Sequence, residues 1–424
     1  MVNTAKPAHI IDSIKSLKGN TRISVLVEPL WGIPFSLYSF YLGLYMKGQG
    51  ITSEQMGFLI SIGFIASVIF AMLGGVITDA LGRKRTTLIF DFLSWPLALL
   101  IYFFSGNFLM FALAQVVNSL GRIVAVSWNL MVVEDADPEQ QVAAYNLINA
   151  INLSAGILTP LAGIIVKHYG IIGGEKIILV FGVISMSAMI LVRNYFYRET
   201  QVGQQILDER KAQTKTGTLK VDLSLFKSLA DKPTTLMALF FSILFNAYIP
   251  IGTFYSLYYA PFLTEILKLD KAAIAILGGI NAGVVLAVFL LLIPLLNRFN
   301  RACVLVAGII LQISALLMFI TIPPGNFFTT AVAVIIFALG FGMVKPFIDS
   351  ILANATAGKE RAGIYAIHNT LVSFCSAGLG LVSGYLYALK PLWIYLISIV
   401  FLLICIGLLL GVEIHRKENH PSQT

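Results

Sequence analysis

The sequence predicts an all-α, polytopic membrane protein with twelve transmembrane helices in two pseudo-symmetric six-helix bundles. Of its 424 residues, 58% are hydrophobic and only 12% are charged, whereas a soluble domain carries about 25% charged residues. The mean hydropathy is +0.85. Because a membrane-spanning helix takes roughly 20–25 residues and a short connection follows it, the chain has room for about twelve. Runs such as 177–192 are apolar on every face, unlike the alternating strands of a membrane β-barrel.

The individual spans follow from apolar stretches that are interrupted by charges, Gly/Pro clusters and polar turns. Lysine and arginine are concentrated in every second connection and near both termini. Because basic loops stay in the cytoplasm, we expect both termini there, in a multi-pass protein of the plasma or inner membrane. The acidic connection 133–140 is the one exception to this charge pattern. The predicted spans are 22–47, 55–79, 86–105, 107–132, 141–167, 176–197, 234–262, 272–296, 302–322, 327–353, 362–389 and 391–413.

The net charge of +8 does not indicate a nucleic-acid-binding protein, because the basic residues lie at the ends of apolar segments. We therefore expect the lipid bilayer as a partner and no nucleic acid. All three cysteines lie inside apolar segments and do not have the spacing of a disulfide or zinc framework. No metal and no cofactor are expected.

One long polar connection, residues 199–232, divides the chain into an N-terminal bundle, 1–198, and a C-terminal bundle, 233–424. Weak internal repeats support this division, since Ala144–Asn149 resembles Ile364–Asn369. Further matches occur at nearly the same offset, which indicates a duplicated six-helix unit of the kind that secondary transporters use.

The connection between the second and third spans carries the clearest motif, GVITDALGRKR over residues 75–85. Its glycines allow a tight turn at a helix end, and its basic triplet suits the anionic inner surface of the membrane. The spacing Gly-x-x-x-Asp-x-x-Gly-basic-basic resembles the signature loop of the major facilitator superfamily. Together with twelve spans, a central linker and a second copy in which Asn297 replaces the acid, the resemblance covers essentially the whole chain.

This resemblance implies two six-helix bundles that rock around a central site, with spans 1, 4, 7 and 10 lining the cavity. It also implies a cytoplasmic gate in which Asp79 and Arg83 hold one conformation, although Ala80 departs from the basic residue usual there. We expect the acidic connection after span 4 to supply partners for the basic triplet. The predicted gate residues are Gly75, Asp79, Gly82, Arg83, Lys84, Arg85, Glu134 and Asp135.

A polar stripe on span 4 points to the cavity independently, because its amide and hydroxyl side chains and Arg122 share one face of the helix. A charge near mid-membrane costs about 2.5–3.5 kcal/mol on insertion scales, so Arg122 is expected to be paired inside the protein. Glu28 on span 1 is the predicted partner. The alternatives are a purely structural ion pair for Arg122 and a hydrated Glu28. The predicted cavity residues are Trp31, Phe35, Asn118, Arg122, Asn129, Asn149, Asn246, Thr253 and Asn369.

Three titratable side chains are candidates for proton coupling. Glu28 is one, because a carboxyl group that moves between an apolar setting and an arginine changes its proton affinity. Asp349 is another, one helical turn from Lys345, with an internal ion pair between them as the alternative. His368 is the third, and a packing role is its alternative. Asp91 on span 3 is expected to be a structural partner of the cytoplasmic gate.

The predicted function is secondary active transport of a small molecule by alternating access, in a protein that works as a monomer with protons as the coupling ion. Export of amphipathic compounds is favoured, since Gly156–Gly163 on span 5 partly resembles the Gly/Pro motif of drug/proton antiporters, with Thr159 in place of a glycine. Proton-coupled uptake of a small organic anion, bound by Arg122, is the first alternative. A polytopic receptor or enzyme is the second, although the sequence has neither a phosphate-binding loop nor a His-Glu-x-x-His helix.

Overall fold

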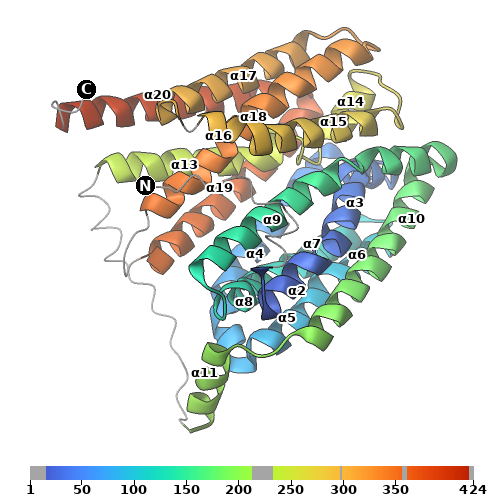
Figure 1. Cartoon of the computed structure of the whole chain (residues 1–424). Helices are drawn as coiled ribbons and strands as arrows, with labels where there is room; N and C mark the ends of the chain where they lie inside the picture. The colour runs from blue at the N-terminus through green and yellow to red at the C-terminus, as the bar shows by residue number, and fades with distance from the viewer. Residues whose placement is uncertain (1–15, 213–232, 297, 356–360, 420–424) are drawn as a thin grey trace. The chain divides into compact units, whose positions relative to one another are not determined.

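The computed structural model describes residues 16–212, 233–296, 298–355 and 361–419, and within these ranges the chain is helical without any strand (Figure 1). In chain order the elements are α2 (Gly19–Val27), α3 (Pro29–Gly48), α4 (Ser53–Leu81), α5 (Arg83–Phe92), the π-helix η1 (Leu93–Leu97), α6 (Ala98–Phe104), α7 (Phe108–Ser119), α8 (Gly121–Val133), α9 (Pro138–Gly156), α10 (Thr159–Phe196), α11 (Gln201–Ala212), α13 (Pro233–Gly252), α14 (Tyr259–Glu265), α15 (Ile274–Ala287), the π-helix η2 (Val288–Leu292), α16 (Ile293–Leu296), α17 (Arg301–Thr321), α18 (Phe327–Ala355), α19 (Arg361–Leu389) and α20 (Trp393–Asn419).

The fold class predicted from the sequence is confirmed. Among the described residues, 10 segments are long and apolar enough to cross a membrane, and the shorter apolar helix Leu236–Gly252 falls in predicted span 7. One of the 10 segments, Pro138–Phe196, contains both predicted spans 5 and 6. The chain turns inside it at Gly170, whose φ of 71° is not helical and lies in the region that glycine adopts readily. The described segments therefore match the twelve predicted spans.

Three of the N-terminal spans are interrupted. Span 1 breaks at Glu28, where Pro29, which lacks a backbone N–H, begins α3. Span 3 contains the π-helix η1 around Pro96, and span 4 breaks at Leu120 between α7 and α8. Interruptions of this kind are tolerated in a membrane where neighbouring groups satisfy the freed backbone, and they are frequent at functional sites.

The chain forms two compact units. Unit 1 comprises Met1–Tyr38, Ala66–Leu158 and Glu175–Leu219, and unit 2 comprises the remainder of the chain. The chain therefore passes from one unit to the other after Tyr38, after Ile65, after Leu158 and after Gly174. The division at residues 199–232 stays a prediction, and of that linker the structure describes only the part up to residue 212, which includes α11.

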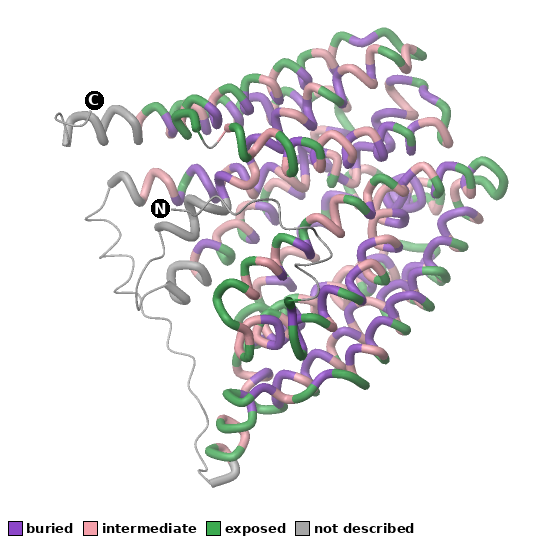
Figure 2. The backbone as a smooth tube through the Cα atoms, viewed as in Figure 1, coloured by how far each residue is buried: buried purple, intermediate pink, exposed green. Residues whose placement is uncertain are grey.

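Buried residues run along the helices of each unit, with exposed residues between them (Figure 2). In unit 1 one apolar cluster joins Leu17 and Val25 to residues of α8 and α9. Large apolar side chains are also exposed, such as Phe104, Leu109 and Phe328. Exposed apolar side chains on membrane-spanning helices are suited to contact with lipid.

Candidate functional site

A buried cluster of three charged side chains lies in unit 1. Arg193 of α10 donates from Nη2 to Oε2 of Glu28 at 2.9 Å and from Nη1 to Oδ2 of Asp91 at 3.4 Å. The three residues are only 5%, 4% and 1% exposed, in that order. Two carboxyl groups therefore share one guanidinium, and the cluster would carry one uncompensated negative charge if both acids were ionised.

The helix breaks place the two acids of this cluster. Glu28 lies at the junction of α2 and α3, and Asp91 shortly precedes the π-helix of span 3. Gly32 leaves room for Asn152 of α9, because a Cβ atom at position 32 would lie 2.6 Å from Oδ1 of Asn152. Asn152 then donates to Oε1 of Glu28 at 3.1 Å. Sequence features that are local to each helix thus bring polar groups together in the interior.

The surroundings of the cluster are apolar. Val27, Ile190 and Phe92, which neighbour the charges along the chain, belong to one hydrophobic cluster. Trp128 lies beside Arg193, whose Cζ is 5.6 Å from the centroid of the indole ring. Electrostatic interactions in such a buried setting are stronger than at a surface.

Two sequence predictions are wrong at this cluster. Glu28 is paired with Arg193, not with Arg122 as expected. Asp91 is paired with Arg193 as well, and not with the gate. Arg193 itself was missed because it ends an apolar run, where an arginine is read as a loop charge. A signal was present, since Tyr195 and Phe196 continue the apolar segment beyond it. Arg122 lies on α8 and is exposed.

Aromatic side chains follow Glu28 along α3. The rings of Trp31 and Phe35 are stacked, with centroids 4.7 Å apart and an interplanar angle of 13°. Trp95 of η1 meets Trp31 edge-on at 5.2 Å. Trp31 and Phe35 are both partly exposed, so the chain does not cover this stack completely.

The predicted cavity amides of spans 4 and 5 have different surroundings. Asn118 donates to the carbonyl of Ser94 at 2.9 Å and so satisfies a backbone group at the π-helix. Asn129 accepts from the hydroxyl of Tyr145 at 3.0 Å and is exposed. Asn149 is exposed on α9. Asn118 therefore stabilises the break in span 3, while the other two remain accessible.

The remaining predicted residues lie in unit 2. His368 is 4% exposed, and its Nε2 is 2.9 Å from the hydroxyl of Ser242. Asn246 donates to the carbonyl of the same serine at 2.9 Å. Asn369 is exposed, and the hydroxyl of Thr253, which follows α13, donates to the carbonyl of Ile249 in that helix. The side chain of Asp349 lies outside the described residues. A single cavity that includes these residues together with those of unit 1 stays a prediction.

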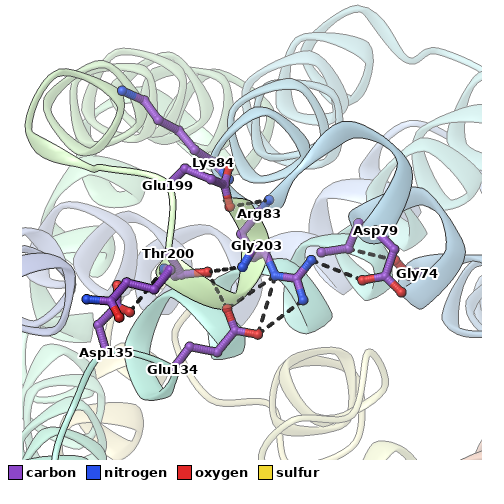
Figure 3. A network of polar contacts seen from close by, with 11 residues as sticks. Gly74, Asp79, Arg83, Lys84, Glu134, Asp135, Glu199, Thr200 and Gly203 are labelled. Atoms are coloured by element: carbon purple, nitrogen blue, oxygen red, sulfur yellow. Dashed lines mark hydrogen bonds and ion pairs between the residues drawn. The ribbon is translucent and has the colours of Figure 1, made fainter. Parts of the chain in front are cut away.

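The motif loop forms a polar network around Arg83 (Figure 3). Gly82 turns the chain with a φ of 86°, and Arg83, only 3% exposed, begins the next helix. The guanidinium donates from Nη1 to Asp79 at 3.0 Å and from Nη2 to Glu134 at 3.1 Å. Both partners expected from the sequence are thus in contact with it. Gly75 lies inside α4, and a Cβ atom there would have no neighbour within 4 Å, so neither packing nor backbone conformation requires a glycine at this position. The positive φ of the turn is at Gly82.

The segment after span 6 completes this network, which the sequence did not indicate. The two carboxylate oxygens of Glu199 accept the backbone N–H groups of Arg83 at 2.9 Å and Lys84 at 3.0 Å. These are free donors in the first turn of α5, and a carboxylate is favoured at that end of a helix. Thr200 donates to Glu134 (Figure 3), and Gln201 N–H donates to Asp135. Arg85 is exposed, so the basic triplet does not act as one block.

A second polar cluster lies within unit 2. Nζ of Lys47 is 2.6 Å from Oε2 of Glu265 and 4.7 Å from the centroid of the Tyr387 ring. The Tyr387 hydroxyl donates to the same carboxylate oxygen at 3.2 Å. The cluster joins the end of α3 to α14 and α19. These residues all lie at the side of the membrane predicted to be external.

Helices α4 and α19 are in backbone contact close to that cluster. A Cβ atom at Gly57 would lie 2.6 Å from the carbonyl oxygen of Gly380 and 2.8 Å from Cα of Gly384. Ser61 donates to the carbonyl of Ala377 at 2.6 Å along the same seam. Small residues allow this close approach, as is common between transmembrane helices.

Comparison with known proteins places the chain among membrane transporters. The family model described as Major Facilitator Superfamily matches residues 31–380 and 251–424. The Quinolone resistance protein NorA of Staphylococcus aureus is 20% identical over 370 residues, which cover 83% of this chain and 88% of that protein. Among solved structures, the nucleoside transporter NupG has a TM-score of 0.67 at 15% identity, over 97% of this chain and 100% of that one. The D-xylose-proton symporter has a TM-score of 0.69 at 15% identity, over 90% and 96%. At these identities the solved structures show the fold alone.

Proposed function

The chain belongs to the major facilitator superfamily and is a multi-pass membrane transporter rather than an enzyme, and from this premise we propose that it exports amphipathic aromatic compounds in exchange for protons by alternating access. The observation that most supports proton exchange is the buried cluster in which Glu28 and Asp91 share the guanidinium of Arg193.

The charge balance of this cluster favours a bound proton. An uncompensated charge in an apolar interior costs several kcal/mol even after the surroundings relax, on the order found for buried ions in general. Two carboxylates and one guanidinium leave one negative charge uncompensated, and a single bound proton removes it. Glu28 is the acid at the end of the aromatic stack, so a ligand that contacts Trp31 also approaches the carboxyl that binds the proton.

The substrate class is supported by the aromatic stack and by the distant relative. Stacked, partly exposed rings such as Trp31 and Phe35 favour planar aromatic ligands. The relative from Staphylococcus aureus is a quinolone resistance protein by name, and quinolones are planar aromatic compounds. Uptake of a small organic anion is the second candidate, and the observation that favours it is the exposed Arg122 within span 4.

Alternating access is supported by two sets of contacts that can hold one state and release it in another. In unit 1 the network around Arg83 holds the loop between spans 2 and 3. In unit 2 the Lys47 and Glu265 pair holds the ends of α3 and α14. Each set consists of charge pairs and hydrogen bonds that water can replace, as a reversible gate requires.

We also propose a monomer in the plasma membrane with both termini in the cytoplasm. The asymmetry of lysine and arginine between the connections supports this orientation. Single cysteines placed near residue 8 and in the connection at residue 50 would be labelled by a membrane-impermeant reagent only at the second position in intact cells. Labelling of the first position would contradict the orientation.

Transport in proteoliposomes tests the function. Vesicles with a pH-sensitive dye inside receive a quinolone, a lipophilic cation, a nucleoside, a sugar or an organic anion in turn. We expect proton movement with the first two only, and none with the variant Glu28→Gln. Glu54→Gln is the matched control, since Glu54 is an exposed glutamate on α4. Proton movement with the organic anion alone would favour the second candidate, and unaltered coupling in Glu28→Gln would refute the assigned proton site.

A further inference from the structure

Asn152 is an amide that contacts Glu28 from an otherwise apolar side of α9. The residues that share this side of the helix, Ile148 and Ala155, are 5% and 4% exposed. The amide donates from Nδ2 to Oε1 of Glu28 at 3.1 Å. Both helices belong to membrane-spanning segments, where a polar side chain is costly unless it serves another polar group. The contact with Glu28 therefore indicates a role for Asn152 beyond packing.

The two oxygens of the Glu28 carboxyl group have different partners. Oε2 accepts from Nη2 of Arg193 at 2.9 Å, whereas Oε1 accepts from Asn152. A guanidinium only donates hydrogen bonds. It can therefore hold Oε2 as a carboxylate oxygen or as the carbonyl oxygen of the neutral acid, but it cannot accept from an O–H group. A proton bound by Glu28 is thus favoured on Oε1, the oxygen in contact with Asn152.

The other end of the Asn152 amide is available to such a proton. Its Oδ1 is buried and has no hydrogen-bond partner among the described residues. An asparagine side chain donates from Nδ2 and accepts at Oδ1, and the torsion that exchanges these two atoms is soft and roughly two-fold. After this rotation, Oδ1 can accept the O–H group of a protonated Oε1. Asn152 can therefore bond to Glu28 in the ionised and in the neutral form, and neither form leaves this oxygen unpartnered.

Gly32 provides the space for the amide. Its backbone N–H donates to the carbonyl of Glu28 at 2.9 Å, so it lies one helical turn further along span 1. A Cβ atom at Gly32 would lie only 2.6 Å from Oδ1 of Asn152. The same Cβ would lie 3.4 Å from Cβ of Ala155, which is an ordinary contact distance. A side chain at residue 32 would therefore displace the amide without forcing the two helices apart.

The rotation requires no movement of a helix. Glu28, Gly32, Asn152 and Arg193 all belong to unit 1, and the atoms that change place are the two ends of one amide. The exchange is therefore possible in any state in which α3 and α9 stay in contact.

We propose that Asn152 is a positioning residue for the proton that Glu28 exchanges. It donates to Oε1 when Glu28 is ionised, and after rotation of its amide it accepts from the O–H group when Glu28 is protonated. This role rests on the proposed proton-coupled function, which assigns the exchanged proton to Glu28. In the step itself a hydronium ion transfers a proton to Oε1, one O–H bond forms there and a water molecule leaves.

Infrared spectroscopy of the purified full chain tests this role. The carbonyl stretch of a protonated carboxyl group falls in frequency with each hydrogen bond that the group makes. In difference spectra between acid and neutral pH, the band that Glu28→Gln removes belongs to Glu28. Asn152→Leu keeps the branched shape of the side chain but cannot bond to the acid, so this band should move to higher frequency. The control Asn146→Leu, at an exposed position of the same helix, should leave the band in place.

Gly32→Ala is a second, independent variant, because it retains Asn152 and displaces only its amide. The Glu28 band should move in the same direction as in Asn152→Leu, and the combination of both changes should move it no further. An unmoved band in either variant would overturn the role of Asn152, and so would additive shifts in the combination.

Proton movement in proteoliposomes separates this role from the function on which it rests. Transport without any proton movement, together with a Glu28 band that shifts in Asn152→Leu, would refute the proposed function and support the role of Asn152. Proton movement that Glu28→Gln abolishes, together with an unmoved band in Asn152→Leu, would support the function and overturn the role. Spectra in which Glu28→Gln removes no band would overturn both.

Discussion

Replacing Arg193 by glutamine removes the cation that two buried carboxyl groups share. The contacts to Glu28 and Asp91 measure 2.9 and 3.4 Å. With an effective dielectric constant of about 20, Coulomb's law gives about 5 kcal/mol of attraction for each. Desolvation of the three groups offsets most of this, and removing one partner from a buried ion pair costs about 3–5 kcal/mol. We expect a loss of that size in the free energy of unfolding for Arg193→Gln.

Removing one of the acids should cost much less. In Glu28→Gln, Arg193 keeps its contact with Asp91, and the cluster becomes a neutral pair. The lost charged hydrogen bond is worth about 1.5–3 kcal/mol, and relief of the excess negative charge offsets part of it. A variant with Arg193→Gln, Glu28→Gln and Asp91→Asn has no buried charge and should regain most of the stability that Arg193→Gln loses. The stability of Arg193→Gln should also be lower at alkaline pH, where both acids are ionised, than at acid pH, where protons neutralise them.

Unfolding in mixed micelles with increasing sodium dodecyl sulfate, followed by tryptophan fluorescence, measures these differences. Two results would contradict a role for the shared charge. Equal losses in Arg193→Gln and Glu28→Gln would mean that the excess of acid over base has no energetic consequence. A triple variant no more stable than Arg193→Gln would mean that the arginine stabilises the fold by packing and not by charge.

Three further predictions concern the contacts at the ends of the helices. Glu199→Ala removes the acceptor of two N–H groups in the first turn of α5, so amide hydrogen exchange in that turn should accelerate. The lost cap should lower the free energy of unfolding by about 0.5–2 kcal/mol. Unchanged exchange would contradict the capping role. Gly57→Val should lower the melting temperature, because the valine side chain would collide with the backbone of α19. Gly75→Ala should leave the melting temperature unchanged, because the space around residue 75 is open. Equal melting temperatures of the two variants would argue against the close approach of α4 and α19. Lys47→Glu and Glu265→Lys should each lower the melting temperature slightly, because the lost pair, which is partly exposed, contributes up to about 1 kcal/mol to the free energy of unfolding. The double exchange should restore the melting temperature, and additive losses would rule out a direct pair.

The sequence predicted those features whose physical cause is local. Hydrophobic runs of membrane-spanning length predicted the spans, because each run must satisfy its own backbone in lipid. The charges of the loop after span 2 predicted the contacts of Arg83 with Asp79 and Glu134, since short connections leave few other partners within reach. In each case the responsible residues are close in the sequence or confined to one end of the helices.

The partner of Glu28 was decided by tertiary structure. Helical periodicity defines which face of a span is polar, but it does not define which neighbouring span that face meets. The sequence pointed to Arg122, whereas the packing of α10 against α3 brings Arg193 to Glu28. For the same reason Glu199, whose carboxylate accepts two backbone N–H groups, could not be recognised from sequence. Burial and the direction of a backbone N–H group are properties of packed helices, whereas hydrophobicity and charge spacing belong to the chain itself.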